Sequence, residues 1–553
     1  MLIEILCDEF LCDGKPRGKI RFHRGLNTVL GTNTGSNSIG KSTFLMIIDF
    51  VFGGEDYVGR LTDVQTEVGA HTIKFSFCFG GNAYYFSRST ADFKVVNRCD
   101  SDYTPLPNKS MSVDEYMVFL QRNYGLTQPG VTLRNAVGRF IRVYNRDTLD
   151  EKHPLHTVKQ ETASTAITGL LKLANLFAGI EEHQKVAKDA KDKRDALRSA
   201  AKYQYIPSVS NQKEYDRNEA RIAELEQQAD ELAHSSSNGL LDLDSMEAMR
   251  LSQAKGQLSG FKRQRASLIA QLHAIRADRG DGRAPRKLGY DDLLHFFPDV
   301  NIQRIEDIDS FHKKLAGILK EEFIETETTL QTALDLLEVE ISALEEEISR
   351  SVIGKGLSKA TLEQYATIDK ELKTLRNAND NYIKEKELSE VAKAYADALD
   401  KLTSEQIAQM QQEINAKMKE LNDRIYDGKK TAPCLSIQDA SHYSFFTPRD
   451  GGTGTQYKGL IVFDLAMLAL TNLPVVVHDS ILLKQIADEA LERIMVLYTE
   501  TEKQVFIALD KEGAYTDTTR EIMESTTVIR VGKGEQALFG RTWNDTGIQQ
   551  GRQ

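Results

Sequence analysis

Cysteine is scarce in this sequence. The 553 residues include only five cysteines, and no two of them have C-x-x-C spacing. This usage suits a reducing compartment and argues against a disulfide framework or a zinc site. The sequence also lacks a recognisable signal peptide and any apolar run long enough to cross a bilayer. We therefore expect a cytoplasmic protein that does not act at a membrane.

Two further scarcities concern charge and proline. The net charge is −11, so no general basic field attracts nucleic acid, and any DNA contact must come from a local patch. Between residues 160 and 430, proline occurs only at Pro207, Pro285 and Pro298. A segment so poor in helix breakers, and rich in Ala, Glu, Lys, Leu and Gln, indicates long helices.

The most informative motif present is G-x-x-x-x-G-K-[ST], at residues 35–42. An apolar strand pattern at 25–31 precedes it, and a buried helix pattern at 43–51 follows. Strand, glycine-rich loop and helix N-terminus together form a phosphate-binding site, although a chance match in a turn is the alternative. Lys41 would reach the β- and γ-phosphates of ATP, and the Ser42 hydroxyl would bind Mg²⁺. The predicted nucleotide-binding residues are Asn33, Thr34, Gly35, Ser36, Asn37, Ser38, Ile39, Gly40, Lys41, Ser42 and Thr43.

Both ends of the chain have α/β patterns. In residues 1–160 we predict strands at 1–7 and 20–22, a hairpin at 73–79 and 84–87, and a helix at 133–144. In residues 431–553 we predict helices at 459–470 and 486–498 and strands at 474–477 and 504–509.

The middle of the chain, residues 161–430, has heptad spacing. Leu251, Ala254, Leu258 and Phe261 alternate at steps of three and four, and similar runs occur near residues 222, 334 and 365. The breaks at 235–239 and 354–356 lie at equal distances from a non-heptad segment at 280–309. We predict an antiparallel coiled-coil hairpin with its tip at 280–309 and an elbow at the two breaks. An ordinary helical bundle is the alternative.

An acidic residue at the end of a buried strand completes a phosphate site, because it holds Mg²⁺ through the metal's water shell. The run of valines at 475–477 leads to His478 and Asp479. We predict that Ser42 and Asp479 are the metal-binding residues.

This organisation resembles SMC-like ATPases with ABC-type heads, in which both chain ends form one head. More specifically, the chain resembles uncharacterised bacterial members whose C-terminal domain of unknown function recurs in ABC-three-component operons. The resemblance implies ATP and Mg²⁺ as ligands and a role with operon-encoded effectors in DNA maintenance, DNA repair or antiviral defence. The matching residues are 37–45, 48–54, Phe311-His312, 452–454 with Tyr457-Lys458, 463–466, His478-Asp479-Ser480 and 538–540.

The candidate catalytic residues are Asp479, Ser480 and His478, and they depart from the broader SMC pattern. Relatives place Glu after the aspartate, where it polarises the attacking water, but Ser480 cannot take a proton at neutral pH. Either another group performs this step or hydrolysis is slow. His478 should face the opposite side of the strand from Asp479, as a buried histidine would. Lys511 occupies the usual place of a switch histidine, where it either contacts the γ-phosphate or is a loop charge.

ABC-type heads also carry a glycine-rich signature that contacts the γ-phosphate of the ATP bound to a partner head. Residues 450–458 precede an apolar helix pattern and lie about 25 residues before Asp479. A flexible loop opening a helix is the alternative. The predicted signature residues, acting in trans, are Gly452, Thr453, Gly454, Thr455 and Lys458.

Three functions follow from these patterns. The first is a slow ATP-driven switch that works as a homodimer joined through its heads. The second is a non-hydrolysing scaffold that binds ATP to dimerise and recruit an effector. The third is a DNA-repair ATPase of the RecN kind, in which basic residues at the tip meet phosphates. These basic residues are Arg276, Arg279, Arg283, Arg286 and Lys287.

Overall fold

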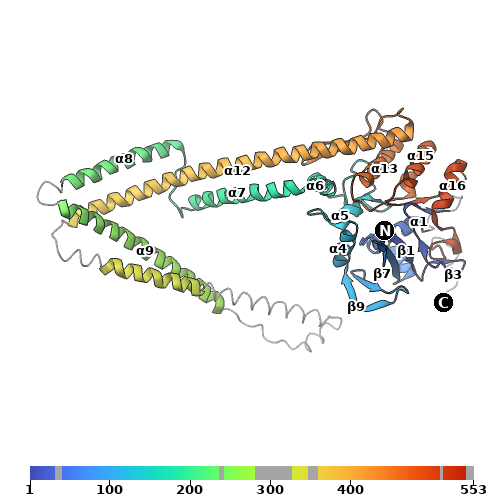
Figure 1. Cartoon of the computed structure of the whole chain (residues 1–553), viewed down its shortest axis with the longest axis horizontal. Coiled ribbons are helices and arrows are strands. Elements are labelled where there is room, and N and C mark those ends of the chain that lie inside the picture. Colours follow the sequence, from blue (N-terminus) through green and yellow to red (C-terminus); the bar gives the residue numbers. More distant parts are fainter. Residues whose placement is uncertain are drawn as a thin grey trace. The chain divides into compact units, whose positions relative to one another are not determined.

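The computed structural model describes residues 1–31, 40–235, 242–280, 327–346, 359–510, 513 and 515–543. The chain divides into two compact units, residues 1–191 with 391–553, and residues 192–390. Elements from the two chain ends lie together in the first unit, where blue and red elements intermingle (Figure 1). This confirms the predicted α/β body, which is built from both chain ends and split by a helical segment.

A five-stranded parallel sheet forms the centre of the first unit. Its strand order is β10-β13-β14-β5-β15, so two strands from the N-terminal part of the chain and three from the C-terminal part form one sheet. The bounds are β5 Gly25–Leu30, β10 Ile141–Arg142, β13 Val475–His478, β14 Gln504–Leu509 and β15 Thr527–Arg530. Every residue of β5, β13 and β14 is buried, which explains why these strands are nearly continuous apolar runs in the sequence.

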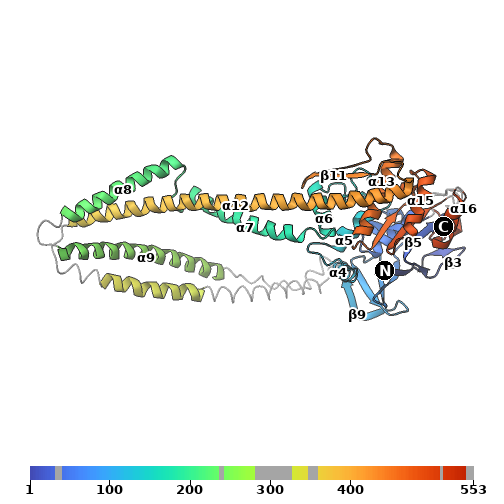
Figure 2. The same ribbon diagram turned by 45° about the horizontal axis from the view of Figure 1, so that its top comes forward.

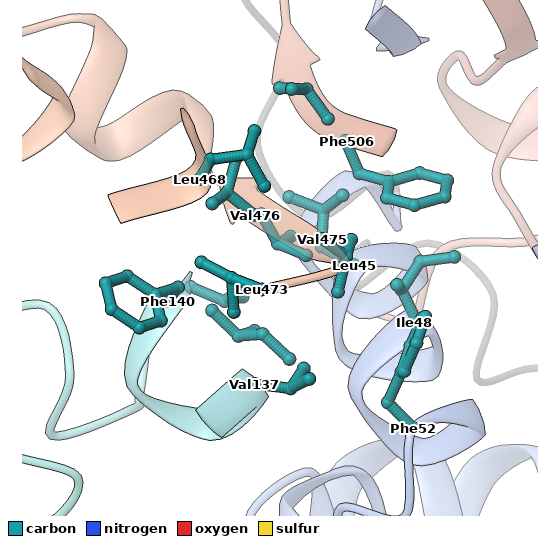
Figure 3. Packing of buried hydrophobic residues seen from close by; sticks show 14 of the residues in the cluster. Leu45, Ile48, Phe52, Val137, Phe140, Leu468, Leu473, Val475, Val476 and Phe506 are labelled. Atoms are coloured by element: carbon teal, nitrogen blue, oxygen red, sulfur yellow. The ribbon is translucent and has the colours of Figure 1, made fainter. Parts of the chain in front are cut away.

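Helices pack on this sheet and bury its apolar surface. Side chains of α1, such as Leu45 and Ile48, lie in one cluster with Val475 and Val476 of β13 and with Leu468 (Figure 3). Each such side chain stabilises the fold by about 1.5–3 kcal/mol when fully buried. The helices of this region are α1 Lys41–Val51, α13 Thr453–Leu470, α14 Ser480–Leu483, α15 Asp488–Thr499 and α16 Asp517–Thr526.

A second, antiparallel sheet has the order β4-β1-β6-β7-β8-β9. It contains the predicted hairpin, whose two-residue turn is formed by Gly80 at φ 56° and Gly81 at φ 83°. Positive φ at both turn positions favours glycine and matches the twist of the strands. The bounds are β1 Leu2–Leu6, β4 Ile20–Arg21, β6 Thr72–Phe79, β7 Asn82–Ser89, β8 Val95–Cys99 and β9 Pro105–Ser112.

The helix predicted over 133–144 is wrong in its second half. Helix α5 (Leu133–Val137) ends in a 3₁₀ turn, and Ile141–Arg142 then forms β10, paired in parallel with β13. Tertiary pairing overrides the local pattern here, because the Arg142 side chain is wholly buried against Asp464. As a result, residues 143–146 leave the carboxyl end of β10 beside Asp479.

The remaining elements of the first unit are short, apart from the helices that continue into the second unit. They are β2 Leu11–Cys12, β3 Lys15–Pro16, α2 Asp56–Gly59, α3 Thr62–Val68, α4 Val113–Asn123, α6 Ala163–Leu173, β11 Cys434–Asp439 and β12 His442–Phe446, with a 3₁₀ turn at Gly534–Gln536. Residues 161–191 and 391–430, assigned from the sequence to the arm, group with the α/β unit. Apolar side chains such as Ile167 and Met418 join the core of that unit, which accounts for this grouping.

The second unit is helical, and its helices run antiparallel. Tyr215 of α8 (Gln212–Ser235) lies 5.6 Å from Tyr382 of α12 (Lys359–Tyr426), ring to ring, while Arg221 lies 3.0 Å from Glu371. The two helices lie side by side in both views (Figures 1 and 2). This antiparallel pairing is the one predicted for the coiled-coil hairpin.

A second antiparallel pair lies between α9 (Asp242–Gly280) and the helical residues 327–346, where Lys262 pairs with Glu345 and Arg265 with Glu338. Helix α7 spans Ala178–Lys202. The predicted break at 354–356 lies outside the described residues, as does all but one residue of the tip at 280–309 and of the break at 235–239.

Candidate functional site

The described end of the phosphate loop is Gly40, which precedes α1. Its φ of 97° is a left-handed conformation, and a Cβ there would lie 2.4 Å from the Leu538 Cβ. Glycine is therefore required both by the backbone and by the close approach of Leu538. Lys41 and Ser42 occupy the first turn of α1, where backbone N–H groups lack intrahelical acceptors. The predicted nucleotide-binding residues at 33–39 lie outside the described residues.

A cavity of about 520 Å³ opens at this helix N-terminus. Residues 40–43 line one side, and Asp479, Ser480 and Lys484 line another. The volume falls within the ~300–1,000 Å³ range of small-molecule sites. The remaining lining residues are Met46, Leu61, Asp63, Tyr144, Asn145, Ile481, Ala537, Leu538, Phe539, Arg541 and Trp543.

The parallel sheet explains why these residues meet. Gly31 follows β5, Asp479 follows β13, and Tyr144 lies two residues after β10. Neighbouring parallel strands place their carboxyl ends at one edge of the sheet, where ligands of open α/β sheets bind. The structure therefore brings residues 40–43, the described end of the phosphate motif, and the predicted acidic residue Asp479 into one site.

Asp479 is fully buried and held in a fixed position. The Tyr144 backbone N–H donates to its Oδ2 at 3.0 Å, and the Ser480 hydroxyl donates to its Oδ1 at 3.1 Å. Ser42 lines the same cavity as Asp479, so the site contains one residue with an alcohol oxygen and one with carboxylate oxygens. Oxygen ligands of this kind, completed by phosphate and water, fit Mg²⁺.

A carboxylate and two lysines lie next to this pair. Asp510, directly after β14, is buried, and its Oδ2 lies 3.2 Å from Lys41 Nζ and 2.8 Å from Lys484 Nζ. Lys484 follows α14, and nothing in the sequence singled it out. Lys511, considered from the sequence as a γ-phosphate contact, lies outside the described residues.

Tyr144 and Asn145 were also missed from the sequence, because the helix predicted over 133–144 included Tyr144 and no motif marked Asn145. A buried ion-pair cluster fixes them: Asp49 Oδ1 in α1 lies 2.6 Å from Arg134 Nη1 and 2.5 Å from Arg146 Nη1. Burial alone would raise the pKa of Asp49, but the two guanidinium groups lower it on balance. The Arg146 contact ties the end of this segment to the helix that follows the phosphate loop.

His478 faces away from the cavity. Its Nδ1 lies 2.6 Å from the Tyr498 hydroxyl and its Nε2 lies 3.0 Å from Asp464 Oδ2, with all three residues fully buried. Arg142 completes the network with two hydrogen bonds to Asp464, of 2.9 and 2.8 Å. This position is the buried one that strand alternation predicts for His478, and it does not favour a catalytic role.

The candidate signature forms the start of α13. Gly452 is the N-cap and is exposed, as is Thr453. Asp450 accepts hydrogen bonds from the Gly452 N–H at 3.1 Å and from the Thr455 hydroxyl at 2.8 Å, which fixes the turn. An added Cβ on Gly454 would lie 2.5 Å from a backbone oxygen, that of Gln485, so this glycine permits close packing.

Lys458, predicted with this signature, lies elsewhere. Its side chain is buried, and its Nζ donates to Asn422 Oδ1 at 2.8 Å. Burial lowers its pKa to about 8. Because α13 begins at Thr453, five residues of helical rotation turn Lys458 inward, away from the exposed N-terminus. The exposed part of the candidate signature is therefore the turn at Gly452 and Thr453.

Comparison with known proteins gives one family match. The model described as "Uncharacterised protein conserved in bacteria (DUF2326)" matches residues 421–543, which include the candidate signature, Asp479 and Asp510. No curated protein matches the chain. Among the described residues, no helix is both long enough and apolar enough to span a membrane.

Among solved structures, similar chains are Smc heads. One from Pyrococcus yayanosii, with a coiled coil and joint, has 14% identity and a TM-score of 0.44, covering 98% of this chain and 96% of that one. One from Pyrococcus furiosus, with an extended coiled coil bound to the C-terminal domain of ScpA, has 11% identity, a TM-score of 0.33, and coverage of 96% and 92%. A third, bound to the C-winged helix domain of ScpA, has 10% identity, a TM-score of 0.34, and coverage of 96% and 93%.

Proposed function

We propose that this chain is an SMC-like ATPase with an ABC-type head, acting as a slow nucleotide-dependent switch. One observation carries the proposal: Lys41, Ser42 and Asp479 line a single cavity at the carboxyl ends of parallel strands. These groups match what a nucleoside triphosphate requires, namely a cation for its phosphates and oxygen ligands for its metal.

Each group has a defined task in this proposal. Lys41 compensates the charge of the β- and γ-phosphates, while the first N–H groups of α1 donate to phosphate oxygens. Ser42 and Asp479 hold Mg²⁺, which would neutralise charge that develops on the phosphates during transfer. Tyr144 and Ser480 keep the Asp479 carboxylate oriented through their hydrogen bonds.

We further propose that the active form is a homodimer in which each head presents its 452–455 turn to the γ-phosphate on the other head. The exposure of Gly452 and Thr453 at the N-terminus of an 18-residue helix supports this, since such a terminus favours anions. A cytoplasmic location, operon-encoded effectors, DNA binding and a role in DNA maintenance, DNA repair or antiviral defence accompany the proposal as predictions.

A second candidate function is a scaffold that binds ATP without hydrolysing it. The observation that favours it is Ser480, which stands where a base is expected and donates its hydrogen bond to Asp479. A RecN-like DNA-repair ATPase remains a prediction as well, because the basic side chains at the tip lie outside the part of the chain whose side chains are described.

The test combines light scattering with phosphate release. We expect ATP and Mg²⁺ to produce a dimer, and turnover slower than the ~1–10³ s⁻¹ typical of enzymes. Thr453→Asp should weaken the dimer, because a carboxylate at this exposed position repels phosphate, while an acid in the first turn leaves the helix itself stable. Thr453→Ser, which keeps the hydroxyl, is the matched control.

The outcomes separate the candidates. A dimer with stoichiometric ATP and no phosphate release identifies the scaffold. A particle size indifferent to nucleotide and to Thr453→Asp refutes the two-head arrangement. Fast turnover by the unmodified chain refutes the slow switch.

A further inference from the structure

The cavity lacks an obvious base for the attacking water. Of the residues that line it, only Asp63 and Asp479 are acidic. Asp479 is assigned to the metal, and its Oδ1 already accepts from Ser480. Asp63 lies on the exposed first turn of α3, where it accepts a hydrogen bond from Trp543 Nε1 at 3.3 Å. Neither is placed to take a proton beside the γ-phosphate.

Asp510 is a third carboxylate at the same edge of the sheet. It is the first residue after β14, the strand between β5, which leads into the phosphate loop, and β13, which leads into Asp479. Its Cβ lies 3.2 Å from the position of an added Cβ on Gly31, the residue that follows β5. Its side chain is only 3% exposed, which limits its access to bulk water.

The lysine contacts define where Asp510 acts. Its Oδ2 is shared between Lys41 Nζ at 3.2 Å and Lys484 Nζ at 2.8 Å, and both lysines line the cavity. Asp510 is not itself one of the lining residues and adjoins the cavity through these two lysines, so its carboxylate faces the γ-phosphate once Lys41 turns to the phosphates. When Lys41 moves to the phosphates, Lys484 remains as the partner that holds Asp510 in place.

We propose that Asp510 is the catalytic carboxylate that orients and deprotonates the attacking water, with Lys484 as its positioning residue. This inference rests on the proposed ATPase function. It assigns a role to the ion pair between buried Asp510 and exposed Lys484, and it supplies the group that Ser480 cannot provide. The shared lysine contacts also predict slow ATP hydrolysis, because the contact between Lys41 and Asp510 must break before Asp510 can accept a proton.

The water oxygen forms a bond to the γ-phosphorus, and one water proton passes to an Asp510 carboxylate oxygen. The bond between the γ-phosphorus and the β–γ bridging oxygen breaks, and its electron pair leaves with ADP, whose charge Lys41 compensates. Asp510 then returns the proton to the released phosphate or to solvent, which restores the carboxylate.

The test uses the full chain with ATP and Mg²⁺. Asp510→Asn keeps the size of the side chain but removes the base, so turnover should fall about 10²-fold or more, the usual general-base contribution. ATP affinity should be equal or higher, because Lys41 no longer has to leave an ion pair. Lys484→Met should lower turnover without weakening ATP binding. Asp517→Asn, at an exposed carboxylate of α16, is the control and should leave both quantities unchanged.

A rescue experiment separates chemistry from structure. Adding Ser480→Glu to Asp510→Asn should restore part of the turnover, because Ser480 lines the cavity and its replacement places a carboxylate there from the β13 side. A purely structural role for Asp510 would give no such rescue. Single-turnover hydrolysis, measured with excess protein, should rank the wild type and the variants in the same order as steady-state turnover. The reason is that the loss of rate lies in the chemical step.

Each remaining outcome bears on the inference. Wild-type turnover in Asp510→Asn overturns it, even if ATP binds more tightly, because Asp510 would then only restrain Lys41. Lost ATP affinity in that variant also overturns it. If Asp510→Asn does not fold, wild-type turnover by Lys484→Met contradicts the inference. ATP binding without hydrolysis by the unmodified chain overturns this inference and identifies the scaffold instead of the slow switch. Absence of ATP binding overturns the proposed function as a whole, whereas hydrolysis that survives Asp510→Asn overturns this inference alone.

Discussion

Asp464→Ala should destabilise the α/β unit strongly. Asp464 and Arg142 are both fully buried and share two hydrogen bonds, so the change leaves a guanidinium without its charge partner. Arg142 would keep only the carbonyl oxygens of Thr148 and Pro154, at 2.6 and 2.9 Å. Removing one partner of a buried ion pair costs about 3–5 kcal/mol, which we take as the expected loss in unfolding free energy.

The chain itself provides the assay. Trp543 is its only tryptophan and contacts Phe539 in the α/β unit, so its fluorescence during urea denaturation reports the unfolding of that unit. Asp517→Ala, which removes an exposed pair with Arg520, is the control and should change little. A loss of unfolding free energy below about 1 kcal/mol for Asp464→Ala would refute the reasoning, because losses that small are typical of solvent-exposed ion pairs.

The same pair predicts a pH dependence. Burial alone would raise the pKa of Asp464, but Arg142 and His478 lower it on balance below its ordinary 3.8. A carboxyl with a lowered pKa in the folded state adds stability above the unfolded pKa of about 3.9 and loses it as pH falls through the folded value. Its contribution should therefore be intact at pH 7 and decline only below about pH 4. If the contribution of Asp464 to stability vanished between pH 7 and 5, the pKa of its carboxyl could not be lowered in the folded state.

Three further predictions concern the cavity and the start of α13. Asp479→Asn should abolish Mg²⁺-dependent turnover, measured as phosphate release, because it removes the charged metal ligand. Unchanged turnover would show that Asp479 does not bind the metal. Gly454→Asp should lower thermal stability as well as dimerisation, because a Cβ there lies 2.5 Å from Gln485 O, and a melting temperature equal to wild type would contradict that packing. Trp543 fluorescence should change when ATP binds, because this side chain lines the cavity, and a spectrum indifferent to saturating ATP would place the nucleotide elsewhere.

Much of the fold follows from local sequence patterns. Strand β14 (Gln504–Leu509) was predicted with its observed limits, because a buried parallel strand is a continuous apolar run bounded by charge. Strand β10 was not, since two residues ending in a buried arginine carry no periodicity. The position of Asp479 beside Lys41 and Ser42 was predictable from its place after such a run, and the close approach at Gly40 follows from the motif.

The rest of the site depends on tertiary contacts. Lys484 and Asp510 are 26 residues apart and meet only because β13 and β14 are neighbours, so neither was distinguishable from an ordinary loop charge. Lys458 was placed in the signature because glycines 451, 452 and 454 resemble a loop, whereas α13 already begins at Thr453. Once the first residue of α13 is known, the inward direction of the Lys458 side chain follows from the 3.6-residue period of the helix.

Equilibrium ATP binding by the purified full chain tests the central claim most directly. We predict one Mg²⁺-dependent ATP per chain, with affinity reduced at least about tenfold in Lys41→Ala, since a hydrogen bond to a charged group contributes about 1.5–3 kcal/mol. Lys484→Ala is the control for loss of a cavity lysine that is not placed on the phosphate loop, and it should retain binding. Absence of ATP binding by the unmodified chain, or equal affinity in Lys41→Ala, would contradict the account.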